Sequence, residues 1–459
     1  MLVRQAVCAG PPPRVRSRAM ITVSNMCVAL LAGVLGCPMQ DRPSDAGVGS
    51  GATGASPIPV ILAEVSPERI RARIERLVSF HTRHTASETR SETRGIGAAR
   101  RWIEADLRES ARLSGGRLQV STQAFDAEIR MGRGREPLEV EIVNVIGFLP
   151  GTIADPKGRT YVVCGHYDSR AGSSRDVESA APGADDDASG TAVVLELARA
   201  MSRHEFEANL VFLCVAGEEQ GLLGSKHYAE WAESEGVLID GMITNDIVGG
   251  VVGGNGVRDE RTIRCYSEAE GLHSPSRELA RTMKAAAGRW VPAANIQLVF
   301  RLDRFQRGGD HIPFHRMGVP AVRLTEANEH YGRQHQDVRI EDGVQYGDLV
   351  EFVSMEYVAL VARVNGATLG ELALAPAPPS NIRMRAAVRY DTELSWTPSP
   401  SSSVAGYEVV WRDTAAPMWE HVSAVTQETT LTIDGVTADT HFFGVRAVDS
   451  AGHRSRAVR

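Results

Sequence analysis

Five short segments of this chain carry the residue types from which a metal-dependent hydrolytic site is built. They are Gly-His-Tyr-Asp at 165–168, Ala-Asp-Asp-Asp-Ala-Ser-Gly at 184–190, Gly-Glu-Glu at 217–219, Asn-Asp at 245–246 and Gln-His-Gln-Asp at 334–337. Together they supply two imidazoles and at least three carboxylates, which are ligands that divalent zinc accepts, and one carboxylate remains for proton transfer. The set predicts a hydrolytic centre that holds two zinc ions.

The positions of these residues relative to predicted strands support that interpretation. His166, Glu218, Glu219 and Asp246 each follow an apolar run that is typical of a buried strand. In an open α/β sheet, sites form at the carboxyl ends of the strands. We therefore expect these four side chains to meet at one edge of a sheet.

Three consecutive carboxylates, at residues 185–187, come just before a helix that is predicted to begin around Ser189. Adjacent carboxylates repel one another unless a cation is present, and a helix N-terminus and a glycine-rich turn help to hold them. Taken alone, the segment is equally well explained by one N-capping Asp with solvated neighbours. The four other segments favour a metal site.

From about Ile58 the sequence alternates between helical and strand patterns, which predicts an α/β domain. The first helix is well marked, because Ser66 can cap it, Pro67 takes its first position and apolar residues follow at helical spacing. Further helices are expected at residues 96–107, 191–201, 222–234, 276–287 and 343–364. Strands are expected at residues 140–148, 161–164, 210–215, 241–247 and 321–324. We expect a mostly parallel mixed sheet flanked by helices.

Length and composition bound the domain organisation. The 459 residues are 43% hydrophobic and 23% charged, which is ordinary for a globular chain of about two folded units. The net charge of −7 gives no reason to expect nucleic acid as a partner. We divide the chain into a leader (1–37), a flexible linker (38–57), the α/β domain (58–372), a second linker (373–380) and a C-terminal domain (381–459).

The leader has the pattern of an export signal, because three arginines precede an apolar run at 28–36 that stops at Cys37. Val-Leu-Gly-Cys at 34–37 resembles the lipobox of bacterial lipoproteins, whose cysteine is acylated after cleavage. The alternative is an ordinary secretion signal with a chance cysteine. In both cases we expect an extracytoplasmic protein, either a cell-envelope lipoprotein anchored at Cys37 or a secreted protein. Residues 38–57, rich in Gly, Ala, Ser and Pro, would be a tether.

The cysteines do not indicate a disulfide framework. Three of the six belong to the leader, which leaves Cys164, Cys214 and Cys265, an odd number that cannot all pair. Cys164 and Cys214 fall inside predicted strands, so we expect them to be small core residues.

The C-terminal segment, from about residue 377, is of a different kind. Prolines mark a linker before it, and alternating apolar and polar runs follow with turns between them. Leu-Ser-Trp at 394–396, Gly-Tyr-Glu-Val-Val-Trp at 406–411 and the run at 441–449 resemble the core strands of a type III fibronectin domain, an all-β sandwich. A spacer or stabilising module is the expected role, and binding to a polymer or cell surface is the alternative.

The main domain, over residues 65–365, resembles the di-zinc exopeptidase family of bacterial leucyl aminopeptidases and aminopeptidase Y, to which glutaminyl cyclases are more distantly related. The motifs His-Tyr-Asp-Ser (166–169), Gly-Ala-Asp-Asp-Asp-Ala-Ser-Gly (183–190), Gly-Glu-Glu-Gln-Gly-Leu-Leu-Gly-Ser (217–225) and Gly-Asp-His-Ile-Pro-Phe (309–314) follow in the order of that family. One such motif would be weak, but four in order are specific.

The resemblance implies a role for each residue of the predicted centre. His166 and Asp246 would hold one zinc ion, Glu219 and His335 the other, with Asp186 as the bridge between them. Asp168 would orient His166 from behind. Glu218 would be the general base, since it precedes the ligand Glu219 and can point towards the attacking water instead of the metal.

The sequence departs from the family pattern in its last motif. A Tyr often precedes the final His in relatives and could steady the oxyanion, but Gln334 stands there. Tyr331 lies four residues before His335, and His330 is a rival ligand, so the oxyanion donor stays open. Asp187 stands where relatives often have Asn, and we expect no loss of metal from it.

The main hypothesis is a zinc aminopeptidase with two ions that acts on peptides with a free N-terminus. One rival is a glutaminyl cyclase or another zinc amidase of the same fold, with one ion. A second rival is a non-catalytic binding or adhesion ectodomain, which would lack ligands or the base, whereas this sequence keeps them all. Loops at 249–258 and 295–307 would line the pocket without a readable motif, so side-chain preference and oligomeric state are not predicted.

Overall fold

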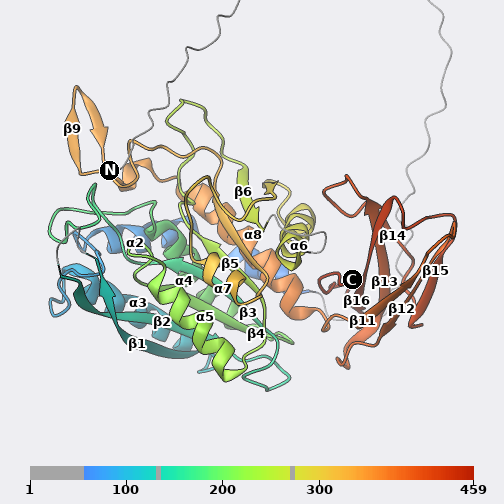
Figure 1. Cartoon of the computed structure of the whole chain (residues 1–459). Helices are drawn as coiled ribbons and strands as arrows, with labels where there is room; N and C mark the ends of the chain where they lie inside the picture. The colour runs from blue at the N-terminus through green and yellow to red at the C-terminus, as the bar shows by residue number, and fades with distance from the viewer. Residues whose placement is uncertain (1–55, 131–135, 269–273) are drawn as a thin grey trace, which may run out of the picture. The chain divides into compact units, whose positions relative to one another are not determined.

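The computed structural model describes residues 56–130, 136–268 and 274–459 (Figure 1). The predicted leader with Cys37, and residues 38–55 of the predicted linker, lie outside the described residues. Within the described part of the chain, no helix has the length and hydropathy needed to cross a bilayer.

The main domain is built on one mixed sheet of eight strands in the order β1-β2-β4-β3-β5-β8-β6-β7. The strands are β1 (Gln119–Ile129), β2 (Leu138–Leu149), β3 (Thr160–His166), β4 (Asn209–Val215), β5 (Ile239–Asn245), β6 (Thr262–Ser267), β7 (Asn295–Val299) and β8 (Ala321–Glu326). The β4-β3-β5-β8 core is parallel, as is the β6–β7 pair, whereas β1–β2, β2–β4 and β6–β8 are antiparallel. The expected mixed sheet is confirmed.

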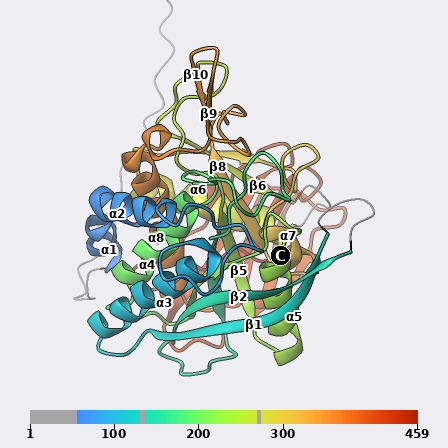
Figure 2. The ribbon, with the colours of Figure 1, turned by 90° about the vertical axis from the view of Figure 1, so that its left-hand side faces the viewer.

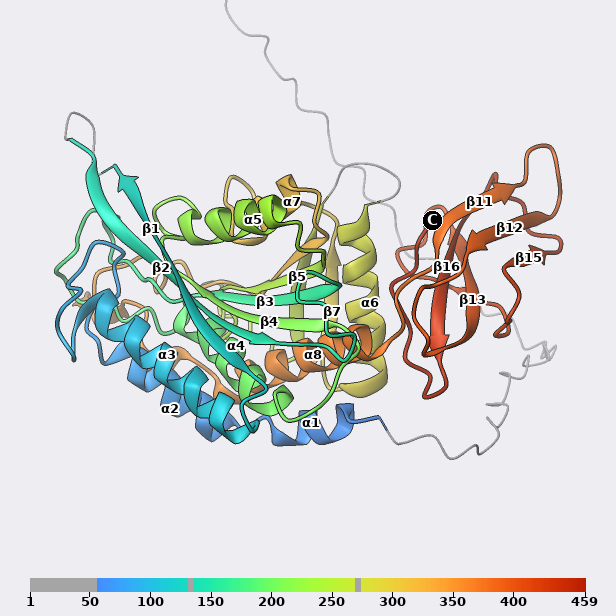
Figure 3. The same cartoon turned by 90° about the horizontal axis from the view of Figure 1, so that it is seen from below.

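Helices cover both faces of this sheet (Figure 3). On one face lie α1 (Ile58–Glu64), α2 (Pro67–Val78), α3 (Gly95–Leu113), α4 (Ala188–Met201), α6 (Pro275–Trp290) and α8 (Met355–Leu374), and on the other lie α5 (Leu223–Glu235) and α7 (His311–Arg316). Successive strand residues alternate between the two cores: Tyr161 and Val163 face the larger one, whereas Val162 and Cys164 face the smaller one. Because both faces are covered, the central strands are apolar throughout.

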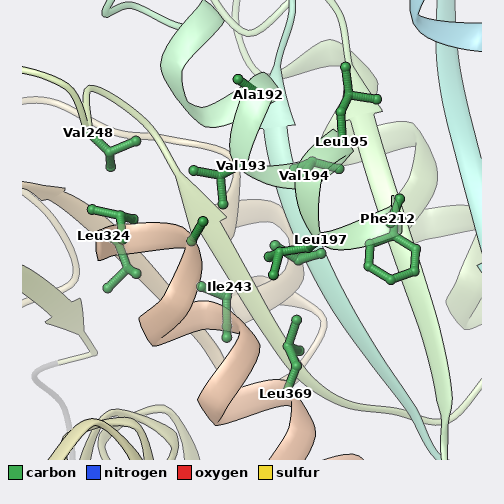
Figure 4. Packing of buried hydrophobic residues seen from close by; sticks show 14 of the residues in the cluster. Ala192, Val193, Val194, Leu195, Leu197, Phe212, Ile243, Val248, Leu324 and Leu369 are labelled. Atoms are coloured by element: carbon green, nitrogen blue, oxygen red, sulfur yellow. The ribbon is translucent and has the colours of Figure 1, made fainter. Parts of the chain in front are cut away.

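Helix α4 lies at the centre of the larger core (Figure 4). Val193, Leu195 and Leu197 are fully buried and belong to one cluster with Phe212 of β4 and Leu369 of α8. A helix that is apolar on nearly every side is expected only where it is enclosed on every side. The packing fixes the N-terminal end of α4, which carries the three adjacent aspartates.

The first long helix begins as the sequence predicts. The Ser66 side chain accepts a hydrogen bond from the Arg69 backbone N–H at 3.3 Å, and Pro67 occupies the first position of α2. The free thiols Cys164, Cys214 and Cys265 are buried, as expected for small core residues.

The predicted helix at 343–364 is wrong in its first half. The chain instead forms the hairpin of β9 (Arg339–Glu341) and β10 (Val344–Tyr346), which projects from the domain (Figure 2), and then a 3₁₀ turn, η1 (Val350–Phe352). Gly343 and Gly347 have φ values of +77° and +107°, which a right-handed helix does not tolerate. Helix α8 starts only after Ser354, whose side chain accepts from the Tyr357 backbone N–H.

Three strands of the eight-stranded sheet, β1, β6 and β7, were not predicted, and β7 corrects the expectation of a loop. Residues 295–299, assigned to a pocket loop, form β7 beside β6. Strand β1 lies at the edge of the sheet and is exposed along most of its length, so it lacks the apolar run that signals a buried strand.

The C-terminal domain consists of two three-stranded antiparallel sheets, β11-β12-β15 and β14-β13-β16. Their strands are β11 (Ser380–Arg385), β12 (Thr392–Thr397), β13 (Val404–Asp413), β14 (His421–Val422), β15 (Thr430–Ile433) and β16 (His441–Asp449). Trp396 and Tyr407 meet edge-on with ring centroids 5.6 Å apart, inside a core that includes Val409 and Phe443. The predicted all-β sandwich is confirmed.

Candidate metal centre

The parallel strands bring most of the predicted site residues to one edge of the sheet. His166 is the last residue of β3, Asp246 directly follows β5, and Glu219 lies four residues beyond β4. Strands β4, β3 and β5 are adjacent and parallel, so their carboxyl ends meet. Asp186 reaches the same point from the loop before α4.

One group of candidate ligands, which we call the deep half, consists of His166, Asp186 and Asp246. Nε2 of His166 lies 3.2 Å from Oδ1 of Asp186 and 4.0 Å from Oδ1 of Asp246. One ligand atom from each residue lies within 4.8 Å of the others, close enough to share one ion. The three residues are buried, so this half is shielded from water.

The second group, the outer half, consists of Asp186, Glu219 and His335. Nε2 of His335 lies 3.0 Å from Oδ2 of Asp186 and 2.9 Å from Oε1 of Glu219. His335 comes from the loop between β8 and β9, has a φ of +49°, and keeps 35% of its side chain exposed. Asp186 thus turns one oxygen towards each half, which is the geometry of a bridging carboxylate.

Asp168 holds three parts of this centre in place. Nδ1 of His166 lies 3.2 Å from the backbone carbonyl oxygen of Asp168 and 3.5 Å from its Oδ1, and the two carboxylate oxygens accept from the backbone N–H groups of Glu218 and Glu219 at 3.3 and 3.2 Å. Fixing Nδ1 of a histidine directs its Nε2 towards a ligand position. Asp168 therefore orients His166 through its backbone carbonyl and its carboxylate, and the carboxylate also anchors the turn after β4.

Asp185 and Asp187, the neighbours of Asp186 in the aspartate loop (residues 185–187), form hydrogen bonds that fix this loop. Asp187 accepts from the Gly190 N–H at the start of α4 and from the His166 N–H at the end of β3. The backbone N–H groups of Asp185 and Asp186 both donate to the carboxylate of Asp348. Asp348 was not among the predicted site residues, because it lies in the segment for which a helix was predicted.

The electrostatics of the centre show how strongly it favours positive charge. Burial alone would lower the pKa of His166, but contacts with Asp168 and Asp186 raise it well above its usual value. Burial would also lower the pKa of His335, but its contacts with Glu219 and Asp186 outweigh that effect and raise its pKa to about 10. Without a metal ion, both imidazoles therefore keep a proton at neutral pH.

Glu218 is half-buried beside the deep half, and its backbone is tied to Asp168. Burial raises the pKa of its carboxyl group well above the usual value, and the charges of Asp246 and Glu219 act in the same direction. A carboxylate whose proton affinity is increased in this way is suited to take a proton from water once cations offset the surrounding negative charge.

Two arginines that sequence reasoning missed contact the ligands. Nη2 of Arg323 lies 2.7 Å from Oδ1 of Asp246, and Nη1 of Arg170 lies 3.7 Å from Oε2 of Glu219. Arg323 stands within the otherwise apolar β8 sequence Ala-Val-Arg-Leu, and such a charge in a buried strand is the signal that could have identified it.

The other residues of the last motifs lie around this centre. His330, the rival ligand, belongs to neither ligand group of the described residues, and Tyr331 is 70% exposed. Gln334 is buried and its Oε1 accepts from Nη2 of Arg307 at 3.3 Å. Nε2 of His311 contacts the backbone carbonyl of Leu302 at 2.7 Å inside the protein, in keeping with a structural histidine.

The donor atoms fit zinc. Both halves offer imidazole nitrogen and carboxylate oxygen, which are ordinary zinc ligands. Oε1 of Glu219 is buried without forming a hydrogen bond, although Nε2 of His335 lies 2.9 Å away. A buried oxygen and a nitrogen that face one another without a hydrogen bond are placed as two ligands of one ion would be.

Comparisons with known proteins place the chain among metal-dependent peptidases. Residues 144–351 match Peptidase family M28, and residues 377–459 match the fibronectin type III domain. A probable zinc metalloprotease of Pyrenophora teres f. teres is 42% identical over 86% of this chain and 85% of its own length. One of Leptosphaeria maculans is 42% identical over 87% of this chain and 96% of its own.

Solved structures share the fold of the main domain. The LapA aminopeptidase of Legionella pneumophila matches with a TM-score of 0.51 and 19% identity, covering 69% of this chain and 74% of its own. An aminopeptidase of Aneurinibacillus sp. matches with a TM-score of 0.50 and 17% identity over 68% and 95% of the two chains. At such identities the likeness shows the fold alone.

Proposed function

Since the chain belongs to peptidase family M28 and is a zinc metallopeptidase, we propose that it is an aminopeptidase with two zinc ions that removes N-terminal residues from peptides. The observation that carries this proposal is the position of Asp186. Its two oxygens lie 3.2 Å from Nε2 of His166 and 3.0 Å from Nε2 of His335, so one carboxylate serves both halves. The choice of a free N-terminus as the substrate feature is prompted by the names of two proteins of the same fold, which are aminopeptidases.

Bound zinc would supply Lewis acidity for the scissile carbonyl and would lower the pKa of the attacking water. The residues of the chain divide the remaining work. Glu218 takes a proton from the water and delivers it to the leaving amine. Asp168 keeps the backbone of Glu218 and the ring of His166 in register, and the acidic surroundings attract the positively charged N-terminus of a peptide.

A substrate panel on the full-length protein tests the proposal. Aminoacyl p-nitroanilides and their N-acetylated counterparts are assayed together with zinc content and with the variant Glu218→Gln. We expect about two zinc ions per chain, cleavage of the free-amine substrates alone, and a loss of about 10²–10⁴-fold in kcat in the variant with its zinc retained.

Other outcomes identify other activities. Cleavage of the acetylated substrates would contradict an aminopeptidase. Cyclisation of peptides with N-terminal glutamine, with one zinc ion per chain, would indicate a glutaminyl cyclase. Full activity of the Glu218→Gln variant would remove Glu218 from the mechanism.

We also propose that this activity is exported from the cytoplasm. The support is the leader sequence, in which an apolar run ends at Cys37. In a bacterial host, fractionation should find the wild-type protein with the membranes and the Cys37→Ser variant in the soluble fraction. Equal distribution of the two proteins would argue against a lipid anchor at Cys37.

A further inference from the structure

Arg323 is an arginine without solvent exposure in the middle of a strand that packs beside the metal centre. Strand β8 pairs with β5 so that Arg323 stands opposite Thr244, close to the end of β5 and Asp246. Its Nη2 lies 2.7 Å from Oδ1 of Asp246 and donates to the Asp246 backbone carbonyl at 3.3 Å. The strand register thus delivers a permanent positive charge to one ligand of the deep half.

The guanidinium is fixed on its other side as well. Nη1 donates to the Gly308 carbonyl at 2.6 Å and lies 3.5 Å from Oδ2 of Asp303. A Cβ atom at Gly309 would come within 2.6 Å of Nη1, so the glycine leaves room for the guanidinium in its present position. These contacts hold Arg323 in place independently of Asp246.

The two halves differ in which oxygen their arginine contacts. In the deep half, Oδ1 of Asp246 contacts Arg323 and is also the oxygen that lies 4.0 Å from His166. In the outer half, Arg170 approaches Oε2 of Glu219, whereas Oε1 faces His335. Arg170 is also one-fifth exposed, so water screens its charge, whereas the charge of Arg323 is not screened.

We propose that Arg323 is a positioning residue that draws negative charge away from Asp246 and thereby selectively weakens cation binding in the deep half. A carboxylate that shares its charge with a guanidinium attracts a cation less strongly than a free one does. The inference rests on the proposed centre with two cations. It adds Arg323 as a residue that makes the deep half bind a cation differently from the outer half.

The test measures each half separately in the full-length protein. His335→Ala removes a ligand of the outer half, and His166→Ala removes a ligand of the deep half. Cobalt(II) is titrated into each variant and followed by its visible absorption, with and without Arg323→Gln. Because a positive charge near the bound cation is removed, we expect Arg323→Gln to tighten cobalt binding about 10- to 100-fold in the His335→Ala background and to leave the His166→Ala background unchanged.

Two further variants separate charge from packing. Arg323→Lys keeps the charge and loses the planar fork, so it should not tighten binding in the deep half. Asp303→Asn removes a carboxylate that competes with Asp246 for Arg323, so it should weaken cobalt binding in the deep half. This prediction has the opposite sign and can be tested even if Arg323→Gln does not fold. Circular dichroism and thermal unfolding check the fold of every variant.

The inference is overturned by weaker or unchanged cobalt binding in Arg323→Gln, by equal tightening in both backgrounds, or by unchanged or tighter binding in Asp303→Asn. Its failure can be told from failure of the proposed function. If the wild-type protein binds two ions and cleaves free-amine substrates, the aminopeptidase stands whatever Arg323 does. If the wild-type protein binds no cobalt and no zinc, the centre itself is refuted; if the wild type binds two ions and neither single-half variant binds cobalt, the two halves do not bind independently and the selective effect of Arg323 is refuted.

Discussion

The deep and outer halves of the metal centre share Asp186 but are positioned by different means. His166 and Asp246 stand at the ends of adjacent parallel strands, where hydrogen-bonded register sets their separation. His335 stands on a loop in a left-handed backbone conformation, which costs on the order of 1–3 kcal/mol and must be offset by contacts of that loop. Ligands on a sheet are placed by the fold, whereas a ligand on a loop depends on a few local contacts.

Removing the shared ligand should have the largest effect. Asp186→Asn takes a charge from both halves, so zinc content should fall well below about two ions per chain and the loss of kcat should exceed the roughly 10²–10⁴-fold loss from removing the base. Elemental analysis and p-nitroanilide hydrolysis measure the two effects. Asp126→Asn, at an exposed position of the edge strand β1, is the matched control. Retention of one tightly bound ion would show that one half survives without the bridge.

The contacts of Glu329 with three arginines should make the free energy of unfolding decrease at acid pH. Burial would raise the pKa of Glu329, but Arg304, Arg307 and Arg323 lower it to about 2. Because this lies below the usual value of about 4.3, the stabilisation of roughly 3 kcal/mol is present above pH 4.3 and is lost as the pH falls towards 2. Urea unfolding of Glu329→Gln should show a large deficit at pH 7 that shrinks by pH 3. The exposed Glu341→Gln should show neither effect.

Metal loading should release protons, and the two halves should contribute about equally. His166 and His335 both have raised pKa values in the metal-free protein, so both are protonated at pH 7 and must lose that proton to bind zinc. Calorimetry in buffers of different ionisation enthalpy should detect at least about two protons per fully loaded chain, since the carboxyl group of Glu218 also has a raised pKa, and apparent affinity should fall about tenfold per pH unit for each proton as pH decreases. Affinity that does not change between pH 8 and pH 6 would contradict this expectation.

A loop contact should affect the outer half alone, and more modestly. The Gly172 backbone N–H donates to Oδ1 of Asp337 at 3.0 Å, which ties the loop of His335 to the loop after β3. Asp337→Ala should weaken cobalt binding about tenfold in the His166→Ala background and leave the His335→Ala background unchanged. Asp342→Asn, an exposed substitution in the neighbouring hairpin, serves as its control. An equal effect on both halves would mean that the loop does not act on His335 alone.

The same contrast explains what could be predicted from the sequence. Apolar strand runs gave the strand ends, and with them the places of His166 and Asp246, because buried strands leave a strong local signal. Asp348 contacts the aspartate loop from more than 160 residues away, and no local pattern records such a contact. Strand β1 was missed because Val120, Phe125 and Ala127, which pack against the larger core, are only partly buried and are separated by polar residues. The hairpin of β9 and β10 was missed because residues 343–346 were included in a predicted helix.

Asp168 has one more consequence, for motion. Its carboxylate contacts the ring of His166 and the backbone of both Glu218 and Glu219, so the end of β3 and the turn after β4 are joined by one rigid group. A displacement of either segment is transmitted to the other. We therefore expect the distances from Glu218 to His166 and to Glu219 to change less than the positions of these residues relative to the rest of the protein. We also expect the thermal fluctuations of His166, Glu218 and Glu219 to be correlated, whereas His335, on its separate loop, is not joined to this group by Asp168.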